Sequence, residues 1–324
     1  MSNWTIHASA CCDMGSIRKN NEDAYYFNGQ FPSLSAMDKG TILTAEANAS
    51  GSLWAICDGM GGQSNGEKAS YTAVSGMQDL QEHLQGRDFE TTIQNWVHQA
   101  NRAVKESADG GGSTLVMLYC SNQYIQTAHI GDSRIYRYHD GQLIRITKDH
   151  SKVEMLLDTN LITQEEARNH PQKNVITRYL GMSSEYVCDA TVGKKIPFSN
   201  GDRFLLCSDG VSDMLTDNEL QTILAKNEDV TVCVKRIRDA VFTAGARDNL
   251  TLILLEMTTL DQLDTIPTNE AILLDETDDD DEPTVEDDDK TAKAKVRVNI
   301  SVDKDSCCEV VFDGFQSRVS LNLG

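Results

Sequence analysis

Short apolar runs separated by polar turns dominate the first 257 residues of the chain. Runs of this kind, bounded by Gly, Asp or Asn, are typical of β-strands. The strands predicted from them are Trp4–Cys11, Ala24–Phe27, Leu53–Asp58, Ser113–Cys120, Tyr124–Ile130, Arg134–His139, Gln142–Ile146, Val187–Val192, Arg203–Ser208 and Leu250–Leu255. Thr41–Thr44 is a candidate for one more short strand. The dipeptide Asp140-Gly141 separates two of these runs and predicts a tight hairpin.

A second group of segments has apolar residues three and four positions apart, the spacing of one helix face. The helices predicted in this way are Gly66–Leu84, Phe89–Ser107, Asn218–Lys226 and Val230–Ala244, with shorter ones at Ser151–Asp158 and Thr163–Asn169. Thr163 and Glu166 have the spacing of a capping box. Helices in pairs between blocks of antiparallel strands predict an α+β fold, in which two stacked sheets are flanked by helices.

The character of the chain changes after Met257. Residues 258–290 are polar, acidic and poor in aromatics, with eleven acidic residues and no basic one between Asp275 and Asp289. Such a composition predicts a disordered linker. Residues 291–324 alternate between apolar and polar positions and predict a short β-rich segment, with strands at Lys295–Val302, Cys308–Phe312 and Arg318–Leu323. We therefore expect three parts: a domain over 1–257, a linker and a C-terminal segment.

Charge and cysteine usage narrow the class of protein. The formal net charge is −21, which argues against nucleic acid or an anionic membrane surface as a partner. Most of the nine cysteines lie within apolar runs, and no Cys-x-x-Cys pair indicates a zinc site. Buried, reduced thiols and a cytoplasmic location are expected. No signal-peptide pattern is visible, and no apolar run approaches the ~20 residues of a membrane helix.

Four aspartates stand at the ends of predicted strands. Asp58 ends an apolar run and is followed by Gly-Met-Gly-Gly, Asp132 and Asp209 also follow apolar runs, and Asp248 precedes one. Each Asp-Gly pair by itself is explained by turn chemistry. Taken together, the four form a constellation of carboxylates, the ligand type that Mg²⁺ and Mn²⁺ prefer.

Six short motifs carry a resemblance to a known family. In chain order they are Asp13-Met-Gly-Ser-Ile-Arg18-Lys-Asn-Asn-Glu22-Asp23, Cys57-Asp58-Gly-Met-Gly-Gly62, Gly112-Ser-Thr114, Ile130-Gly-Asp132-Ser-Arg134, Cys207-Ser-Asp209-Gly-Val-Ser212-Asp213 and Asp248-Asn249. Over residues 1–257 the chain resembles the metal-dependent protein phosphatases of the 2C type (the PPM family), in their bacterial branch. The resemblance implies a four-layer α-β-β-α sandwich, with a mobile flap at the two short helices beside the active site.

The resemblance also implies a binuclear Mn²⁺ or Mg²⁺ centre. Asp58 would bridge the two ions, Gly59 would offer its backbone carbonyl to one, and Asp209 and Asp248 would bind the other. Asp132, together with Asp209, matches the position of a third, weaker ion. Two ions ~3.5–4 Å apart activate a bridging water that attacks the phosphoryl group directly.

Further roles follow for residues around this centre. Arg18 is the candidate catalytic clamp for phosphate, because a guanidinium can bind two phosphoryl oxygens at once. Glu22 and Asp23 match an acidic pair that holds metal-bound water. Asn249 either orients Asp248 or forms an Asx turn. Met60 stands where eukaryotic members have a histidine proposed as the general acid, so the acid stays unassigned.

The predicted function is that of a cytoplasmic, monomeric serine/threonine phosphoprotein phosphatase that reverses phosphorylation by a Hanks-type kinase. The alternative is a non-catalytic signalling or interaction protein with the same fold. A two-metal nuclease is disfavoured by the acidic charge balance. The acidic linker is interpreted as a solvated spacer, with autoinhibition of the active site as an alternative.

Overall fold

The computed structural model describes residues 4–33, 40–61, 65–121, 123–183, 188–226 and 228–259, and the backbone of residues 300–302, 308–312 and 315–318. The chain separates into two compact units, Met1–Ile266 and Pro267–Gly324. The predicted linker therefore lies outside the described residues, except for its first two positions.

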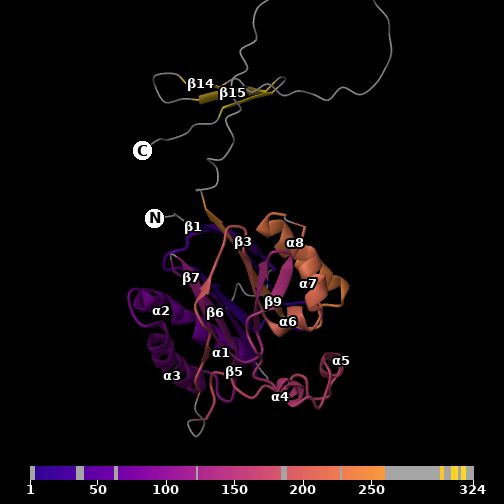
Figure 1. Ribbon diagram of the computed structural model, residues 1–324. Coiled ribbons are helices and arrows are strands. Elements are labelled where there is room, and N and C mark those ends of the chain that lie inside the picture. Colours follow the sequence, from indigo (N-terminus) through magenta and orange to yellow (C-terminus); the bar gives the residue numbers. More distant parts are fainter. Residues whose placement is uncertain are drawn as a thin grey trace, which may run out of the picture. The chain divides into compact units, whose positions relative to one another are not determined.

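Two antiparallel sheets form the centre of the first unit (Figure 1). The first sheet has the strand order β3 (Ile42–Asn48), β1 (Trp4–Asp13), β13 (Leu250–Thr259), β12 (Arg203–Cys207), β8 (Arg134–His139) and β9 (Gln142–Arg145). The second has the order β10 (Thr191–Val192), β7 (Tyr124–Ile130), β6 (Leu115–Cys120), β4 (Leu53–Met60) and β2 (Asp23–Phe27), with β11 (Ile196–Pro197) beside β7 and β5 (Gly112–Ser113) beside β4.

Helices cover the outer face of each sheet (Figure 1). The second sheet is covered by α1 (Asn65–Ser75), α2 (Met77–Leu84) and α3 (Phe89–Ser107), and the first by α6 (Asp209–Ser212), α7 (Asp217–Leu224) and α8 (Val230–Thr243). Two short helices, α4 (Lys152–Asp158) and α5 (Gln164–Arg168), lie apart from these layers. The predicted α-β-β-α sandwich is confirmed.

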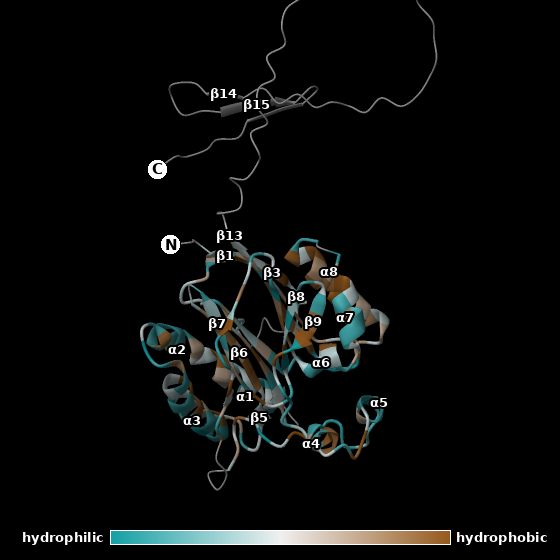
Figure 2. Cartoon of the chain, in the orientation of Figure 1, coloured by the Kyte–Doolittle hydropathy of each residue, from teal (hydrophilic) through white to brown (hydrophobic). Residues whose placement is uncertain are grey.

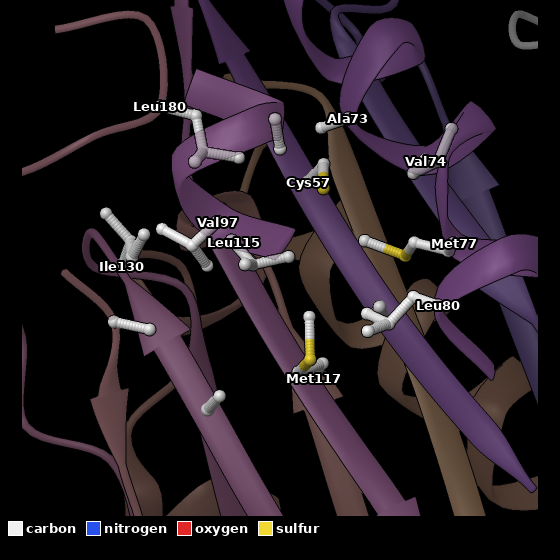
Figure 3. Packing of buried hydrophobic residues seen from close by; sticks show 14 of the residues in the cluster. Cys57, Ala73, Val74, Met77, Leu80, Val97, Leu115, Met117, Ile130 and Leu180 are labelled. Carbon is white, nitrogen blue, oxygen red and sulfur yellow. The ribbon is translucent and has the colours of Figure 1, made fainter. Parts of the chain in front are cut away.

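Three apolar clusters hold the layers together, one between each pair of neighbouring layers. Strand β4 shows how the strand period of two serves this arrangement. Leu53, Ala55 and Cys57 pack toward the helices, whereas Trp54 and Ile56 pack between the sheets, and all five are fully buried. Figure 3 shows the helix-side cluster from close by, and Figure 2 shows polar residues on the outer helix surfaces. Buried on both faces, β4 provides a rigid base for the residues at its end.

Several element boundaries differ from the prediction. Gly66–Leu84 is two helices rather than one, separated at Gly76, whose carbonyl accepts hydrogen bonds from Trp96 Nε1 at 3.2 Å and from Leu80 N at 3.4 Å. The strand predicted at Ser113–Cys120 divides at Thr114 into β5 and β6. Of the predicted strand Val187–Val192, residues 188–192 are described, and only Thr191 and Val192 among them form a strand, β10.

Two predictions made from short sequence motifs are confirmed. The hairpin at Asp140-Gly141 joins β8 to β9, and Thr163 and Glu166 form the predicted capping box at α5. The seven described cysteines are buried and free of disulfides. None of the described helices has the length and apolar content that crossing a membrane requires.

The second unit contains a small antiparallel sheet with the order β14 (Ile300–Val302), β15 (Cys308–Phe312) and β16 (Phe315–Arg318). The strands β14 and β15 fall within the predicted ones. The structure has a strand over residues 315–317 that was not predicted, and Arg318 ends it; the rest of the predicted strand Arg318–Leu323 lies outside the described residues.

A buried arginine ties α7 and α8 to the first sheet. The guanidinium of Arg203 donates to Glu256 Oε1 at 2.9 and 3.0 Å and to the carbonyls of Glu228 and Leu224 at 2.6 and 3.4 Å. Its side chain is 3% exposed. Sequence patterning placed Arg203 only at the start of a strand, because nothing local marks a buried cation.

We expect Arg203→Met to lower the free energy of unfolding by about 3 kcal/mol, because it leaves the partly buried Glu256 and two backbone carbonyls without their partner. Arg236→Met removes an exposed ion pair with Glu228 and serves as the control, with an expected loss under ~1 kcal/mol. Urea denaturation followed by circular dichroism measures both. Equal losses in the two variants would contradict the structural role of Arg203.

Candidate active site

Five segments bring acidic side chains to one end of the two sheets. Asp58 near the end of β4 lies opposite Asp23 at the start of β2 in the strand register. Asp132 follows β7, Asp209 begins α6 directly after β12, and Asp248 precedes β13. These residues are separated by up to 225 positions in the sequence, and antiparallel pairing of their strands gathers them.

The carboxylates repel one another electrostatically. Burial raises the pKa of Asp58 well above its usual value, and repulsion from Asp23 and Asp209 raises it further. The pKa of Asp209 is likewise raised by burial, then by Asp132 and Asp248. Like charges disfavour ionisation when they share a site. The five carboxylates therefore form a single electrostatic cluster, which we call the carboxylate cluster.

The carboxylate oxygens of this cluster are the type of ligand that hard divalent cations bind. Buried carboxylate oxygens at Asp23 (Oδ1) and Asp132 (Oδ1) have no hydrogen-bond partner among the described residues. Burial first, and then Asp149, raise the pKa of Asp132 to about 7. Nowhere in the described part do three His, Cys, Asp or Glu side chains converge closely enough to hold an ion. Repulsion opposes closer approach of the carboxylates, and a divalent cation would offset it.

Thr114 fixes the backbone at Asp58. Its hydroxyl accepts from Asp58 N at 2.9 Å, its own N–H donates to Asp58 O at 2.8 Å, and the hydroxyl also bonds Ser133 Oγ at 2.8 Å. A Cβ at Gly131 would lie 2.7 Å from Thr114 Cγ2, so only glycine allows this approach. Thr114 thus couples Asp58 to the Asp132 turn. Sequence reasoning quoted Thr114 only as part of a motif.

The acidic pair Glu22 and Asp23 is held between the sheets. Asp23 Oδ2 accepts from Ser208 Oγ at 2.8 Å, and burial raises the pKa of Asp23 to about 6. The carbonyl of Glu22 accepts from Gly59 N at 3.0 Å and Ser70 Oγ at 2.6 Å. A Cβ at Gly59 would lie 2.5 Å from that carbonyl, which explains why glycine follows Asp58.

Arg18 reaches the carboxylate cluster from the turn between β1 and β2. Its NH2 group donates to Asp248 Oδ2 at 2.6 Å, and its side chain is 48% exposed. Close approach of this turn to the segment before β13 depends on Gly15 (φ +76°), where a Cβ would lie 2.2 Å from Asp248 O. The structure therefore places a half-exposed guanidinium beside the carboxylates.

A cavity of about 380 Å³ adjoins the cluster. Asp132 and Asp209 line it, together with Arg134, Asp149 and side chains of α4 and α5. The segment that carries these two helices is closed at its base by a bridge between Ser151 and Ile176. The region predicted to form a flap thus borders a cavity that opens onto the candidate active site.

His150 occupies a structural position at this base. Its Nδ1 accepts from Gly131 N at 3.1 Å, its Nε2 bonds Thr191 Oγ1 at 2.9 Å, and its ring stacks on His129 at 4.7 Å. Burial, followed by His129 and Arg178, lowers the pKa of His150 to about 4. The ring is therefore neutral at neutral pH, which does not suit a general acid.

Comparison with known proteins matches this geometry to a family. Residues 40–250 match the family model described as "Protein phosphatase 2C". The serine/threonine phosphatase stp of Listeria monocytogenes serotype 4b is 30% identical over 261 residues, which cover 78% of this chain and 96% of the relative.

Solved structures agree with this assignment. The serine/threonine phosphatase PstP/Ppp of Mycobacterium tuberculosis has a TM-score of 0.65 at 30% identity, covering 78% of this chain and 98% of that one. A structure of the PstP catalytic domain in complex with two manganese ions has a TM-score of 0.63 at 29% identity, covering 79% and 99%. The resemblance inferred from the six motifs is confirmed, and the chain belongs to the protein phosphatase 2C family, in its branch of bacterial metal-dependent serine/threonine phosphatases.

Proposed function

We propose that the chain hydrolyses phosphoserine and phosphothreonine in proteins at the carboxylate cluster. The observation that carries the proposal is the gathering of mutually repelling carboxylates at one end of both sheets, with Arg18 beside them. Such a cluster is unfavourable by itself and suits a site that binds cations.

The residues that would hold two Mn²⁺ or Mg²⁺ ions are Asp58 as the bridging ligand, the Gly59 carbonyl, Asp209 and Asp248. Asp132 and Asp209 would bind a third, weaker ion. When bound, such ions lower the pKa of water and neutralise charge on phosphoryl oxygens.

The remaining side chains position the reactants. Thr114 holds the backbone at Asp58, and Glu22 and Asp23 would keep water oriented through their carboxylates. Arg18 has five N–H donors, so its bond to Asp248 leaves others for two phosphoryl oxygens of the substrate. Its partial exposure lets a phosphorylated side chain approach from solvent.

The wider biological role follows from the family. We propose that the substrates are cytoplasmic phosphoproteins, that a Hanks-type kinase acts in opposition, and that the chain works as a monomer. Residues 1–257 would form the phosphatase domain, 258–290 a spacer and 291–324 a separate C-terminal segment. The names of the relatives support serine and threonine as the dephosphorylated residues.

Metal dependence is the first expectation to test. With a phosphothreonine peptide we expect turnover with Mn²⁺ or Mg²⁺ and none with EDTA. Asp209→Asn should lower kcat by about 100-fold or more, comparable to the loss of one oriented electrostatic group. In EDTA the same variant should raise Tm, because it removes one of the repelling charges. Turnover that persists in EDTA would contradict the proposal.

Asp239→Asn supplies the matched control, since Asp239 lies on the exposed surface of α8. It removes the same charge and should leave kcat and Tm close to those of the parent. If Asp209→Asn and Asp239→Asn behaved alike, the non-catalytic alternative would gain support.

Arg18 should act on substrate binding. Arg18→Ala is expected to raise KM for the phosphopeptide and the inhibition constant of inorganic phosphate by about tenfold, the loss of a charge-assisted hydrogen bond or two. Arg18→Lys should keep only part of the affinity that Arg18→Ala loses, because an ammonium lacks the planar fork of a guanidinium. Lys19→Ala removes the neighbouring cation of the same turn as a control. If Lys19→Ala raised KM and the inhibition constant equally, the effect of Arg18→Ala would reflect the loss of a positive charge and not a specific contact with phosphate.

A further inference from the structure

The connection between β1 and β2 carries two of the proposed site residues yet contains no helix or strand. We call residues 14–22 the Arg18 loop; it includes Arg18 and Glu22. A guanidinium binds phosphate specifically only when its backbone is held, because a mobile loop loses conformational entropy on binding. The contacts that hold this loop therefore decide how well Arg18 works.

Asn249 makes three side-chain hydrogen bonds to the Arg18 loop. Its Oδ1 accepts from Glu22 N at 2.8 Å, and its Nδ2 donates to Met14 O at 2.9 Å and to Asn20 O at 3.0 Å. Asn249 is 4% exposed. One amide thus bonds both ends of the loop, and both of its N–H donors are used.

The bond from Asn249 to its neighbour Asp248 is of another kind. The backbone N–H of Asn249 donates to Asp248 Oδ1 at 2.8 Å. Any residue except proline would supply that N–H, so it does not account for an asparagine. The three hydrogen bonds to the Arg18 loop explain why this residue is an asparagine.

A second contact strengthens the same junction. Ser16 N donates to Ala246 O at 2.8 Å, three residues before Asn249. The segment 246–249 therefore lies along the Arg18 loop, and the amide of Asn249 and the carboxylate of Asp248 both bond to the loop.

We propose that Asn249 is a positioning residue that holds the Arg18 loop and thereby sets the affinity of the site for phosphate. The proposal rests on the phosphate-binding role proposed above for Arg18. An amide suits this position because it presents one acceptor and two donors. Aspartate has nearly the same shape but would direct a carboxylate oxygen at two backbone carbonyls.

The experiment uses the full chain with saturating Mn²⁺. Asn249→Ala should raise KM for a phosphothreonine peptide and the inhibition constant of inorganic phosphate by about tenfold, as expected for a few lost hydrogen bonds. Calorimetry should find the Mn²⁺ affinity within about twofold of the parent, since the backbone bond to Asp248 remains. In the Arg18→Ala background, Asn249→Ala should raise KM no further, because it acts through Arg18.

A structural readout follows the loop without catalysis. Trypsin should cleave after Arg18 or Lys19 about tenfold faster in Asn249→Ala than in the parent, because local opening exposes the loop. Asn200→Ala is the matched control: Asn200 Oδ1 accepts from Thr259 N at 3.0 Å, at the opposite end of β13. It should change neither KM nor cleavage. Should Asn249→Ala fail to fold, Asn249→Ser, which removes the amide without adding a charge, carries the same test.

Three results would overturn the proposal. Unchanged tryptic cleavage in Asn249→Ala would show that the amide does not hold the loop. A tenfold loss of Mn²⁺ affinity, or full additivity with Arg18→Ala, would show that Asn249 acts on the metal ligands instead. In the third result, Arg18→Ala leaves KM and phosphate inhibition unchanged while tryptic cleavage still rises in Asn249→Ala. In that case Arg18 does not bind phosphate, and the effect on phosphate affinity assigned to Asn249 is wrong as well.

Discussion

Mutual repulsion among buried carboxylates is the constraint on which the structure depends. Asp58 and Asp209 have raised pKa values because each is partly buried and faces other acids. Removing carboxylates from water is costly, and placing several together costs more. A fold retains such an arrangement when binding of a cation offsets the cost. In the proposed function, the cluster would link folding to metal binding, and metal binding to phosphoryl chemistry.

The sandwich supplies the rigidity that this arrangement needs. Strand β4 is buried on both faces and delivers Asp58, while Thr114 fixes the backbone there. The first sheet delivers Asp209 and Asp248 at the ends of β12 and β13, which are paired neighbours. Asn249 then attaches the loop that carries Arg18. Each site residue thus stands on a strand end or is bonded to one, so packing of the core fixes the site.

Most of the fold could be predicted because local patterns report local structure. A short apolar run ended by a turn signal marked β4, which extends two residues further than predicted. The spacing of apolar residues marked α3 and α8, and the limits of these two helices agree within one residue. The break at Gly76 and the short β10 depend on tertiary contacts, which override propensity. The motifs pointed to the aspartates, but the roles of Thr114 and Arg203 became visible only with the contacts between distant strands.

The central proposal is that Asp58 would serve as the shared ligand of two divalent ions held by the carboxylate cluster. Counting bound Mn²⁺ by equilibrium dialysis, in the parent chain and in Asp58→Asn, tests it most directly. The account predicts at least two ions per chain in the parent and the loss of both when the shared ligand is neutralised. Binding of the same number of ions with unchanged affinity in Asp58→Asn would contradict it.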